Sequence, residues 1–365
     1  MNIPLGKPDI GEDEIQAVVE TMKSGWVTQG RKVDQFEESF AEYCGVRHGV
    51  AVNTGTAALH TALAALGIRE GDEVITTPLS CVATTNPIVY LNAKPVFVDV
   101  EPSTLNMNPG LIEEKITSKT RAILAVHLFG HPVDLDPIMK VAQKHDLYLI
   151  EDAAQAHGAR YRCKRVGSFG DVSCFSFYAD KLITTVEGGI ALTDDDELAE
   201  KMRRLRSFGM GKKKKFFHPV LGYNYKMSDI QAAIGLVQLQ KLNRYIDRRR
   251  SNINYLRSRL NAADLKLPVE LDYAYNVYYV CHVRTKKRKD KVIEYLERKG
   301  IETRPLLSFI PEQPPYRKYQ DTTKGLNVAR SAHQKGFYVS NSPLLTENEL
   351  DYLVSTLTES VGDIG

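Results

Sequence analysis

The stretch HGVAVNTGTAALHTALAALGIREGDEVITTP (residues 48–78) holds two short apolar, β-branched runs on either side of a segment with helical periodicity. The runs at 48–53 and 72–78 predict strands, and the segment at 56–67 predicts a helix. The same alternation continues with strands at 94–100, 122–129, 147–152 and 171–177 and helices at 81–92 and 134–146. It predicts an α/β fold with a mainly parallel sheet covered on both faces.

A second region follows Ser228, a residue type that is typical of a helix N-cap. Apolar residues recur at helical spacing from there toward Leu260 and predict a long connecting helix. Beyond it we expect a smaller α+β domain, formed by a strand-like run at 274–284, a helix at 289–300, a strand at 301–306 and a terminal helix at 346–359. We therefore predict a large domain at 1–240 and a small domain at 241–365.

The overall composition excludes several classes of protein. A length of 365 residues is enough for two domains with full cores. The net charge of +3 argues against a dedicated nucleic-acid-binding protein, and no run of 18 apolar residues predicts a membrane span. Five scattered cysteines without a CxxC pair, and a start that lacks a signal-peptide pattern, favour a cytoplasmic protein without a metal site.

Three weak signals point to one crevice. Asp152 follows a predicted strand, Gly55 lies at a strand-to-helix turn, and Ser176 precedes Lys181 at the end of another strand. Taken separately they have plain explanations, namely a helix cap, a backbone requirement and a surface lysine. Together they are the parts that hold pyridoxal 5′-phosphate: a lysine for the aldehyde, a carboxylate for the ring nitrogen and a helix N-terminus for the phosphate.

The sequence also resembles the DegT/StrS family of pyridoxal-phosphate-dependent nucleotide-sugar aminotransferases. The resemblance extends over almost the whole chain and rests on these motifs: SGWVTQG (24–30), NTGTAALHTAL (53–63), EDAAQAHGA (151–159), FSFYADKLITTVEGG (175–189), GYNYKMSDIQAAIGLVQL (222–239) and GIETRP (300–305). It implies the aspartate aminotransferase fold, which is fold type I of the pyridoxal-phosphate enzymes.

The resemblance assigns roles to residues around the cofactor ring. It implies that Lys181 forms a Schiff base with the cofactor, that Asp152 pairs with the pyridine nitrogen and that Gln155 approaches the ring hydroxyl. The freed Lys181 amine then moves the proton during transamination. We expect burial to lower the pKa of this amine, which helps a general base.

The resemblance also implies how the phosphate is held. Gly55, Thr56 and Ser176 are expected to bind it, and Asn224 is expected to reach it from a neighbouring subunit. The active site is then shared across a homodimer.

The resemblance implies the transfer of an amino group from L-glutamate to a nucleotide-linked keto-sugar, with a 4-keto-6-deoxyhexose as the leading expectation. Two other interpretations stay open: a 3-keto-sugar or cyclitol aminotransferase, and a non-catalytic sensor or scaffold that binds pyridoxal phosphate.

Some positions depart from the family pattern or carry no clear assignment. Cys81 occupies a position where the family usually has an aromatic residue that stacks on the cofactor. The segment 308–316 lacks a histidine that family members often carry. The lysine run Lys212–Lys215 is either a solvated loop or a contact to the nucleotide's pyrophosphate across the dimer.

Overall fold

The structure is a computed structural model that describes residues 1–211 and 216–362, so the predicted contact of Lys212–Lys215 lies outside the described residues. The α-helices are α1 (Glu12–Lys23), α2 (Arg31–Cys44), α3 (Gly55–Ala65), α4 (Val82–Tyr90), α5 (Leu135–Lys144), α6 (Asp196–Arg206), α7 (Asp229–Arg259), α8 (Lys289–Arg298), α9 (Asn327–Lys335) and α10 (Glu347–Gly362). Short 3₁₀ helices are η1 (Pro109–Leu111), η2 (Glu113–Lys115), η3 (Leu128–Gly130), η4 (Ile310–Glu312) and η5 (Pro314–Thr322). The strands are β1 (His48–Val52), β2 (Glu73–Thr76), β3 (Lys94–Phe97), β4 (Thr120–Val126), β5 (Tyr148–Asp152), β6 (Arg160–Tyr161), β7 (Lys164–Arg165), β8 (Val172–Ser176), β9 (Gly189–Thr193), β10 (Leu265–Lys266), β11 (Ala274–Tyr275), β12 (Cys281–Thr285), β13 (Arg304–Pro305) and β14 (Gly336–Val339).

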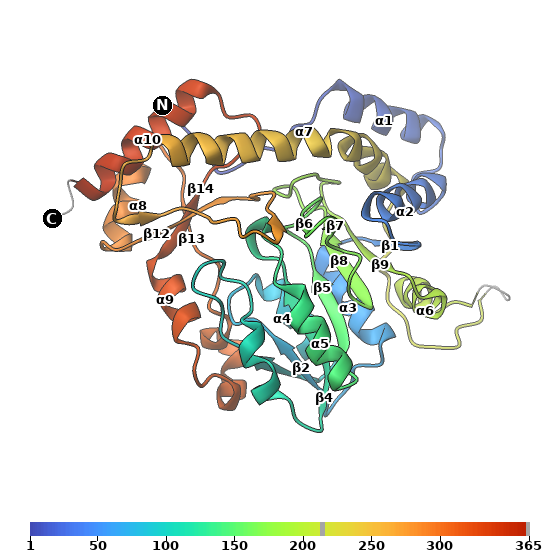
Figure 1. Ribbon diagram of the computed structural model, residues 1–365. Helices are drawn as coiled ribbons and strands as arrows, with labels where there is room; N and C mark the ends of the chain where they lie inside the picture. Colours follow the sequence, from blue (N-terminus) through green and yellow to red (C-terminus); the bar gives the residue numbers. More distant parts are fainter. Residues whose placement is uncertain (212–215, 363–365) are drawn as a thin grey trace.

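The central sheet has seven strands in the order β1-β9-β8-β5-β4-β2-β3 (Figure 1). β9 is antiparallel to both of its neighbours, whereas the pairs from β8 through β5, β4 and β2 to β3 are parallel. The predicted mainly parallel sheet is therefore confirmed. β1 and β2, which are consecutive predicted strands, lie far apart in this sheet.

Helices cover both faces of this sheet because its strands are apolar on both sides. Along β1, Val50 and Val52 belong to a core cluster that includes residues of α3, α4 and α6. Ala51, which lies between them, belongs to the opposite cluster together with residues of α2, α5 and α7. Successive strand residues thus alternate between two cores, as the period of a β-strand requires.

The long helix predicted after Ser228 is confirmed as α7. The Ser228 hydroxyl accepts a hydrogen bond from the Gln231 amide, and the Gln231 side chain accepts one from the Ser228 amide, which forms a capping box. In Figure 1, α7 runs across the top of the molecule from α1 and α2 to α8 and α10.

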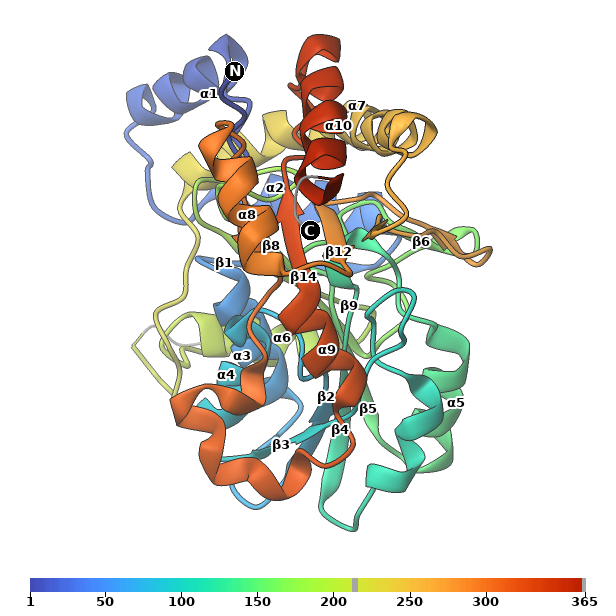
Figure 2. The ribbon, with the colours of Figure 1, turned by 90° about the vertical axis from the view of Figure 1, so that its left-hand side faces the viewer.

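A third core cluster surrounds the far end of α7. It contains Ile253 and Leu256 of α7 and the buried faces of α8, α10, β12 and β14, which lie beside one another in Figure 2. β10, β12, β14 and β13 form a four-stranded antiparallel sheet. The domain boundary at residue 240 stays a prediction. This residue lies inside α7, and Leu242 still packs in the core that α2 and α5 form with the central sheet.

The strand expected at 274–284 is interrupted. Only β11 and β12 form there, and residues 276–280 between them have no strand pairing. The Asn276 side chain accepts a hydrogen bond from the Tyr278 amide, and Tyr278 has a positive φ of 48°. This local turn ends strand pairing and places Tyr279 toward the sheet.

In the part of the chain that the structure describes, no helix is long and apolar enough to cross a bilayer.

Candidate active site

A pocket of about 320 Å³ opens where β5 and β8 end. Asp152 is the last residue of β5, Ser176 is the last residue of β8, and α3 begins beside them. This is the edge at which open α/β sheets bind ligands, and the volume is within the range of small-molecule pockets. The pocket is lined by six of the seven site residues predicted from the sequence, namely Gly55, Thr56, Asp152, Gln155, Ser176 and Lys181.

The N-terminus of α3 forms one wall of the pocket. Thr54 is the N-cap and accepts a hydrogen bond from the Ala57 amide at 3.0 Å, while the Gly55 and Thr56 amides have no intrahelical acceptor. A Cβ atom on Gly55 would lie 2.6 Å from the Ser176 Cβ and 3.0 Å from its hydroxyl oxygen. Glycine therefore lets the helix start approach Ser176, and this arrangement suits an anion.

Asp152 is buried and is held by two neutral donors. Its Oδ2 accepts a hydrogen bond from the Thr84 hydroxyl at 2.7 Å, and its Oδ1 accepts one from the Ala154 amide at 3.2 Å. The Ser80 hydroxyl lies 2.8 Å from that of Thr84 and extends this chain. Burial raises the pKa of Asp152, and the Thr84 and Ala154 hydrogen bonds only partly offset it.

Gln155 lies on the loop after β5. Its side-chain carbonyl oxygen accepts a hydrogen bond from the Phe129 amide at 2.8 Å. The NH₂ group of the same amide therefore remains as the donor that it can present to a ligand.

The amine of Lys181 has two polar neighbours. Its Nζ donates a hydrogen bond to the Tyr279 hydroxyl at 3.1 Å and lies 3.4 Å from Oδ1 of Asp180. Burial alone lowers the pKa of this amine, but the negative charge of Asp180 and the Tyr279 oxygen outweigh it, so the pKa is raised. The expectation of a lowered pKa was therefore wrong, because it considered burial without these partners.

Asn224 lies outside this pocket. It is exposed, it forms an isolated bridge with Ser207, and its side-chain oxygen accepts a hydrogen bond from Lys226 at 2.6 Å. A single chain therefore does not bring Asn224 to the other predicted residues, and its contact to the phosphate stays a prediction.

Cys81 lines the pocket as an exposed residue at the start of α4. Among the described residues that line the pocket, Tyr178 is the one with an aromatic ring, and it is 46% exposed.

Four residues around this pocket were not predicted from the sequence. Ser80 and Thr84 stand in the segment TTPLSCVATTN, and nothing in that pattern indicates a bond to Asp152. Asp180 directly precedes Lys181, and this adjacency was the available signal. Tyr279 lies 98 positions beyond Lys181, and only the fold brings the two together.

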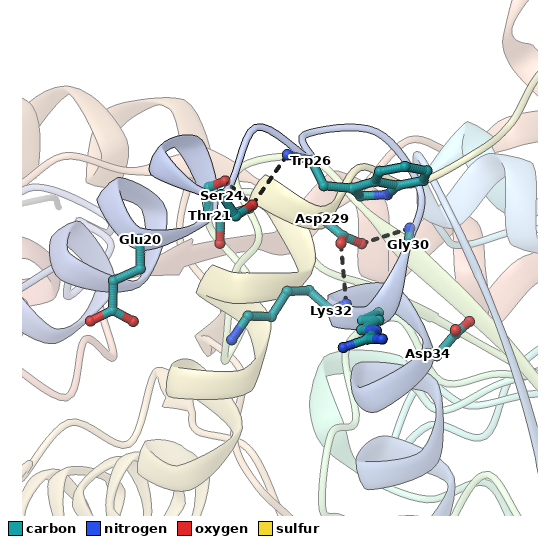
Figure 3. A pocket seen from close by; sticks show the side chains of 9 residues that line it. Glu20, Thr21, Ser24, Trp26, Gly30, Lys32, Asp34 and Asp229 are labelled. Atoms are coloured by element: carbon teal, nitrogen blue, oxygen red, sulfur yellow. Dashed lines mark hydrogen bonds between the residues drawn. The ribbon is translucent and has the colours of Figure 1, made fainter.

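A larger cavity of about 680 Å³ lies between α1, α2 and the start of α7 (Figure 3). None of the predicted site residues lines it. Asp229 points into this region, but its carboxylate accepts hydrogen bonds from the backbone amides of Gly30, Lys32 and Val33 and so stabilises the N-terminus of α2. The Asp229 carboxylate therefore has a structural role.

The smaller pocket fits pyridoxal 5′-phosphate. A buried carboxylate with neutral donors alone, such as Asp152, is stabilised by a cation, and a protonated pyridine nitrogen is one. The start of α3 with Ser176 suits the phosphate, and the Lys181 amine suits the aldehyde. Fold and pocket thus define the class of pyridoxal-phosphate-dependent enzymes with a mainly parallel sheet.

Comparison with known proteins agrees with this class. The sequence profile of the DegT/DnrJ/EryC1/StrS aminotransferase family matches residues 8–358, so the chain belongs to this family. A curated relative, the GDP-perosamine synthase of Caulobacter vibrioides, is 40% identical over 365 residues, which cover 98% of each chain. The protein is therefore an aminotransferase, and its cofactor is pyridoxal 5′-phosphate.

Solved structures agree with the fold. DesV of S. venezuelae, in complex with a ketimine intermediate, has a TM-score of 0.93 and 33% identity and covers 98% of both chains. The putative sugar aminotransferase Spr1654 of Streptococcus pneumoniae, in its PLP form, has a TM-score of 0.95 and 27% identity over 100% of both chains. The aspartate-aminotransferase-like fold is thus confirmed.

Proposed function

We propose that this aminotransferase moves an amino group from L-glutamate to the ketone of a GDP-linked 4-keto-6-deoxyhexose. The observation that carries the proposal is the similarity to a GDP-perosamine synthase along nearly the whole chain. An amino sugar on GDP is the product that this name describes, and a 4-keto-6-deoxyhexose is a precursor that fits it.

The residues of the pocket divide the work. Gly55, Thr56 and Ser176 bind the phosphate, and Gln155 donates to the ring hydroxyl. When bound, the cofactor supplies a ring that accepts an electron pair from the substrate carbon.

Asp152 keeps the ring nitrogen protonated, because a cation beside a buried carboxylate is favoured. Lys181 holds the aldehyde in the resting enzyme. Once its amine is released, it removes the proton from Cα of the donor.

We further propose a homodimer in which Asn224 completes the partner's site. Large apolar side chains are exposed at positions that precede Asn224 in the sequence, with Phe208 at 48%, Phe216 at 88% and Leu221 at 90%. Such a group of exposed apolar residues is typical of a protein contact. Asn224 is exposed in the same part of the sequence and does not line the pocket of its own chain. In a dimer, it can therefore reach the pocket of the second copy.

We also propose that the reaction takes place in the cytoplasm. All five cysteines are free, which suits a reducing compartment.

A panel of nucleotide-linked keto-sugars, each incubated with the holoenzyme and L-glutamate, tests the substrate. We expect mass spectrometry to detect an amino product from the GDP-linked 4-keto-6-deoxyhexose and none with Lys181→Ala. Conversion of a 3-keto-sugar or a cyclitol alone would overturn the 4-keto assignment. Cofactor absorbance that glutamate leaves unchanged would instead favour a sensor or scaffold.

Mixing two inactive variants tests the shared site. Lys181→Ala and Asn224→Ala subunits, unfolded together and refolded, form heterodimers in which one site has both residues intact. We expect about a quarter of the wild-type activity to return in an equal mixture, since half of the dimers are mixed. No recovery from two variants that each refold as dimers would contradict the contribution of Asn224.

A further inference from the structure

Three side chains, of which Lys181 lines the pocket, form a closed triangle. The Lys181 amine donates to the Tyr279 hydroxyl at 3.1 Å, the Tyr279 hydroxyl donates to Oδ1 of Asp180 at 2.9 Å, and Oδ1 of Asp180 lies 3.4 Å from the amine. The amine also lies 4.6 Å from the centroid of the Tyr279 ring. It is therefore surrounded by a carboxylate, a hydroxyl oxygen and an aromatic face.

Burial makes this arrangement necessary. The Lys181 side chain is 16% exposed and Tyr279 is 8% exposed, so water contributes little to the solvation of the amine. A buried ammonium ion is unfavourable unless an anion and hydrogen-bond acceptors replace the lost water. Asp180, whose side chain is 39% exposed, supplies the anion from the solvent side.

Tyr279 is fixed by its backbone. Its carbonyl oxygen accepts a hydrogen bond from the buried Arg249 of α7 at 2.7 Å, and its amide donates to the Phe129 carbonyl at 2.9 Å. Because both backbone groups are held and the hydroxyl itself donates to Oδ1 of Asp180, the hydroxyl has a defined position. The amine thus meets a preformed acceptor, which a flexible surface side chain could not offer.

We propose that Asp180 and Tyr279 are positioning residues that receive the Lys181 amine whenever it is not bound to the cofactor. The inference rests on the proposed transamination, in which this amine alternates between a bound and a released state. When the donor's amine takes its place on the cofactor, Lys181 leaves as a neutral amine. It then takes one proton from Cα of the donor and becomes an ammonium ion.

Asp180 and Tyr279 favour that proton transfer because they stabilise its product. The amine is neutral when it is released from the cofactor and is stabilised by these residues once it is protonated. Proton transfer to it therefore has a larger driving force. The same contacts keep the amine from turning into solvent, so it stays within reach for its return to the cofactor. The raised pKa of Lys181 agrees with this function.

Other titratable and charged groups also face this triangle. Those that interact electrostatically with Lys181 are Cys81, Asp152, His157 and Tyr338, and those that interact with Asp180 are Glu187, Arg249 and Arg304. Asp180 and Tyr279 are the two that contact the amine directly.

The pH dependence of Lys181 acylation tests the proposal without measuring turnover. The holoenzyme is first converted by glutamate to its amino form, in which Lys181 is free, and is then labelled with trace acetic anhydride at a series of pH values. Peptide mass spectrometry gives the labelled fraction of Lys181, and an exposed lysine serves as the internal standard. Only the neutral amine reacts, so the midpoint reports its pKa.

We expect Asp180→Asn to lower the midpoint by about one pH unit, which is about a tenfold faster labelling at pH 8. Tyr279→Phe is expected to lower it by less, since the carboxylate remains, and Asp180→Glu is expected to restore most of the wild-type midpoint. Glu294→Gln, which removes an exposed carboxylate that pairs with Lys291 on α8, is the control and leaves the midpoint unchanged. Equal midpoints for the wild type and Asp180→Asn would overturn the proposal.

Failure of the proposed function gives a different signal. If glutamate does not convert the cofactor, transamination is disproved, and the midpoint is measured instead on full-length protein freed of cofactor with hydroxylamine. If Asp180→Asn lowers the midpoint in the cofactor-free protein, Asp180 does stabilise the protonated Lys181 amine, but this contact does not serve transamination. Circular dichroism of each variant separates a local effect from unfolding.

Discussion

Glu151 and Asp152 are neighbours at the end of β5, yet they lie on opposite sides of the sheet in opposite electrostatic settings. Glu151 accepts five hydrogen bonds, from His127, Ser173 and the backbone amides of 167, 169 and 170. Burial raises its pKa, but these donors outweigh burial and lower the pKa to about 2. For Asp152, burial prevails over two neutral donors and the pKa is raised.

This difference separates a structural acid from an acid that awaits a ligand. Burial is similar for the two, at 0% and 4% exposed, so the number and charge of the partners decide. His127 accepts a hydrogen bond from the Val133 amide at Nδ1, and its Nε2 therefore carries a proton toward Glu151. Glu151 is satisfied by the protein, whereas the donors that Asp152 has among the described residues are neutral, so it gains most from a cation on a bound ligand.

Asp152→Asn is expected to have the largest effect on the reaction. An amide cannot hold a proton on the ring nitrogen, so kcat should fall by at least about 100-fold. The free energy of unfolding of the cofactor-free protein should stay within about 1 kcal/mol of the wild type, because an uncompensated buried charge is removed. Steady-state kinetics and urea unfolding measure the two quantities, and a large loss of stability would contradict the comparison.

Glu151→Gln is expected to show the reverse pattern. It leaves His127 and the amide donors with a weaker acceptor, and breaking a buried pair of this kind costs about 3–5 kcal/mol of unfolding free energy. At temperatures where the variant is folded, kcat should remain close to that of the wild type. Thermal unfolding of the cofactor-free protein measures the loss of stability, and steady-state kinetics measure kcat. Asp152→Asn is the matched control for both measurements.

Acid unfolding sharpens the same contrast. A folded pKa of about 2 for Glu151, against the ordinary value of 4.5, contributes stability that is present above pH 4.5 and lost as the pH falls toward 2. Glu151→Gln should therefore lose less stability than the wild type over this range. Parallel curves for the two proteins would mean that Glu151 does not carry this part of the acid sensitivity.

Gly55→Ala is expected to have a moderate effect on stability and on cofactor binding. Its Cβ would meet Ser176 at 2.6 Å, so the start of α3 must move away from β8. We expect a loss of about 1–3 kcal/mol of stability and weaker binding of pyridoxal phosphate. Gly6→Ala is the control because nothing lies within 4 Å of its Cβ, and equal cofactor affinity in the two variants would contradict the close approach.

Thr84→Val is expected to have the smallest effect. It removes the hydroxyl that donates to Asp152 and so raises the pKa of that acid further. Because the cation on the ring nitrogen remains the main partner, kcat should fall by only about three- to tenfold, consistent with the loss of one hydrogen bond of about 1 kcal/mol. A pH–rate profile whose acidic limb does not shift upward would show that Thr84 leaves Asp152 unaffected.

The sequence predicted the central fold well because its signals are local. The strand runs from 48 to 177 and the Ser228 cap each appear within a few residues, and the structure confirms them. The five-residue β9 of the central sheet was missed, as were β6 and β7, a two-residue hairpin whose other partner, β11, is distant in the sequence. Burial patterns alone could not show that β1 pairs with β9.

The candidate site was predicted in part for the same reason. Its six pocket-lining residues come from the ends of β5 and β8, the loops that follow these strands and the start of α3, which sequence patterns locate. The partners that set the charge of Asp152 and Lys181 come from other segments: Thr84 from the start of α4 and Tyr279 from the loop before β12. The error about the pKa of Lys181 follows from this, because burial can be inferred from sequence and neighbours cannot.

The 31-residue helix α7 joins the two ends of the molecule without a flexible joint. At a rise of 1.5 Å per residue it is a rod of about 46 Å, with its first turns in the core shared with α2 and α5 and its last turns in the third cluster. Arg249 of α7 donates a hydrogen bond to the backbone carbonyl oxygen of Tyr279. Because Arg249 joins α7 to the loop that carries Tyr279, we expect a shift of the third cluster to change the position of the hydroxyl beside Lys181.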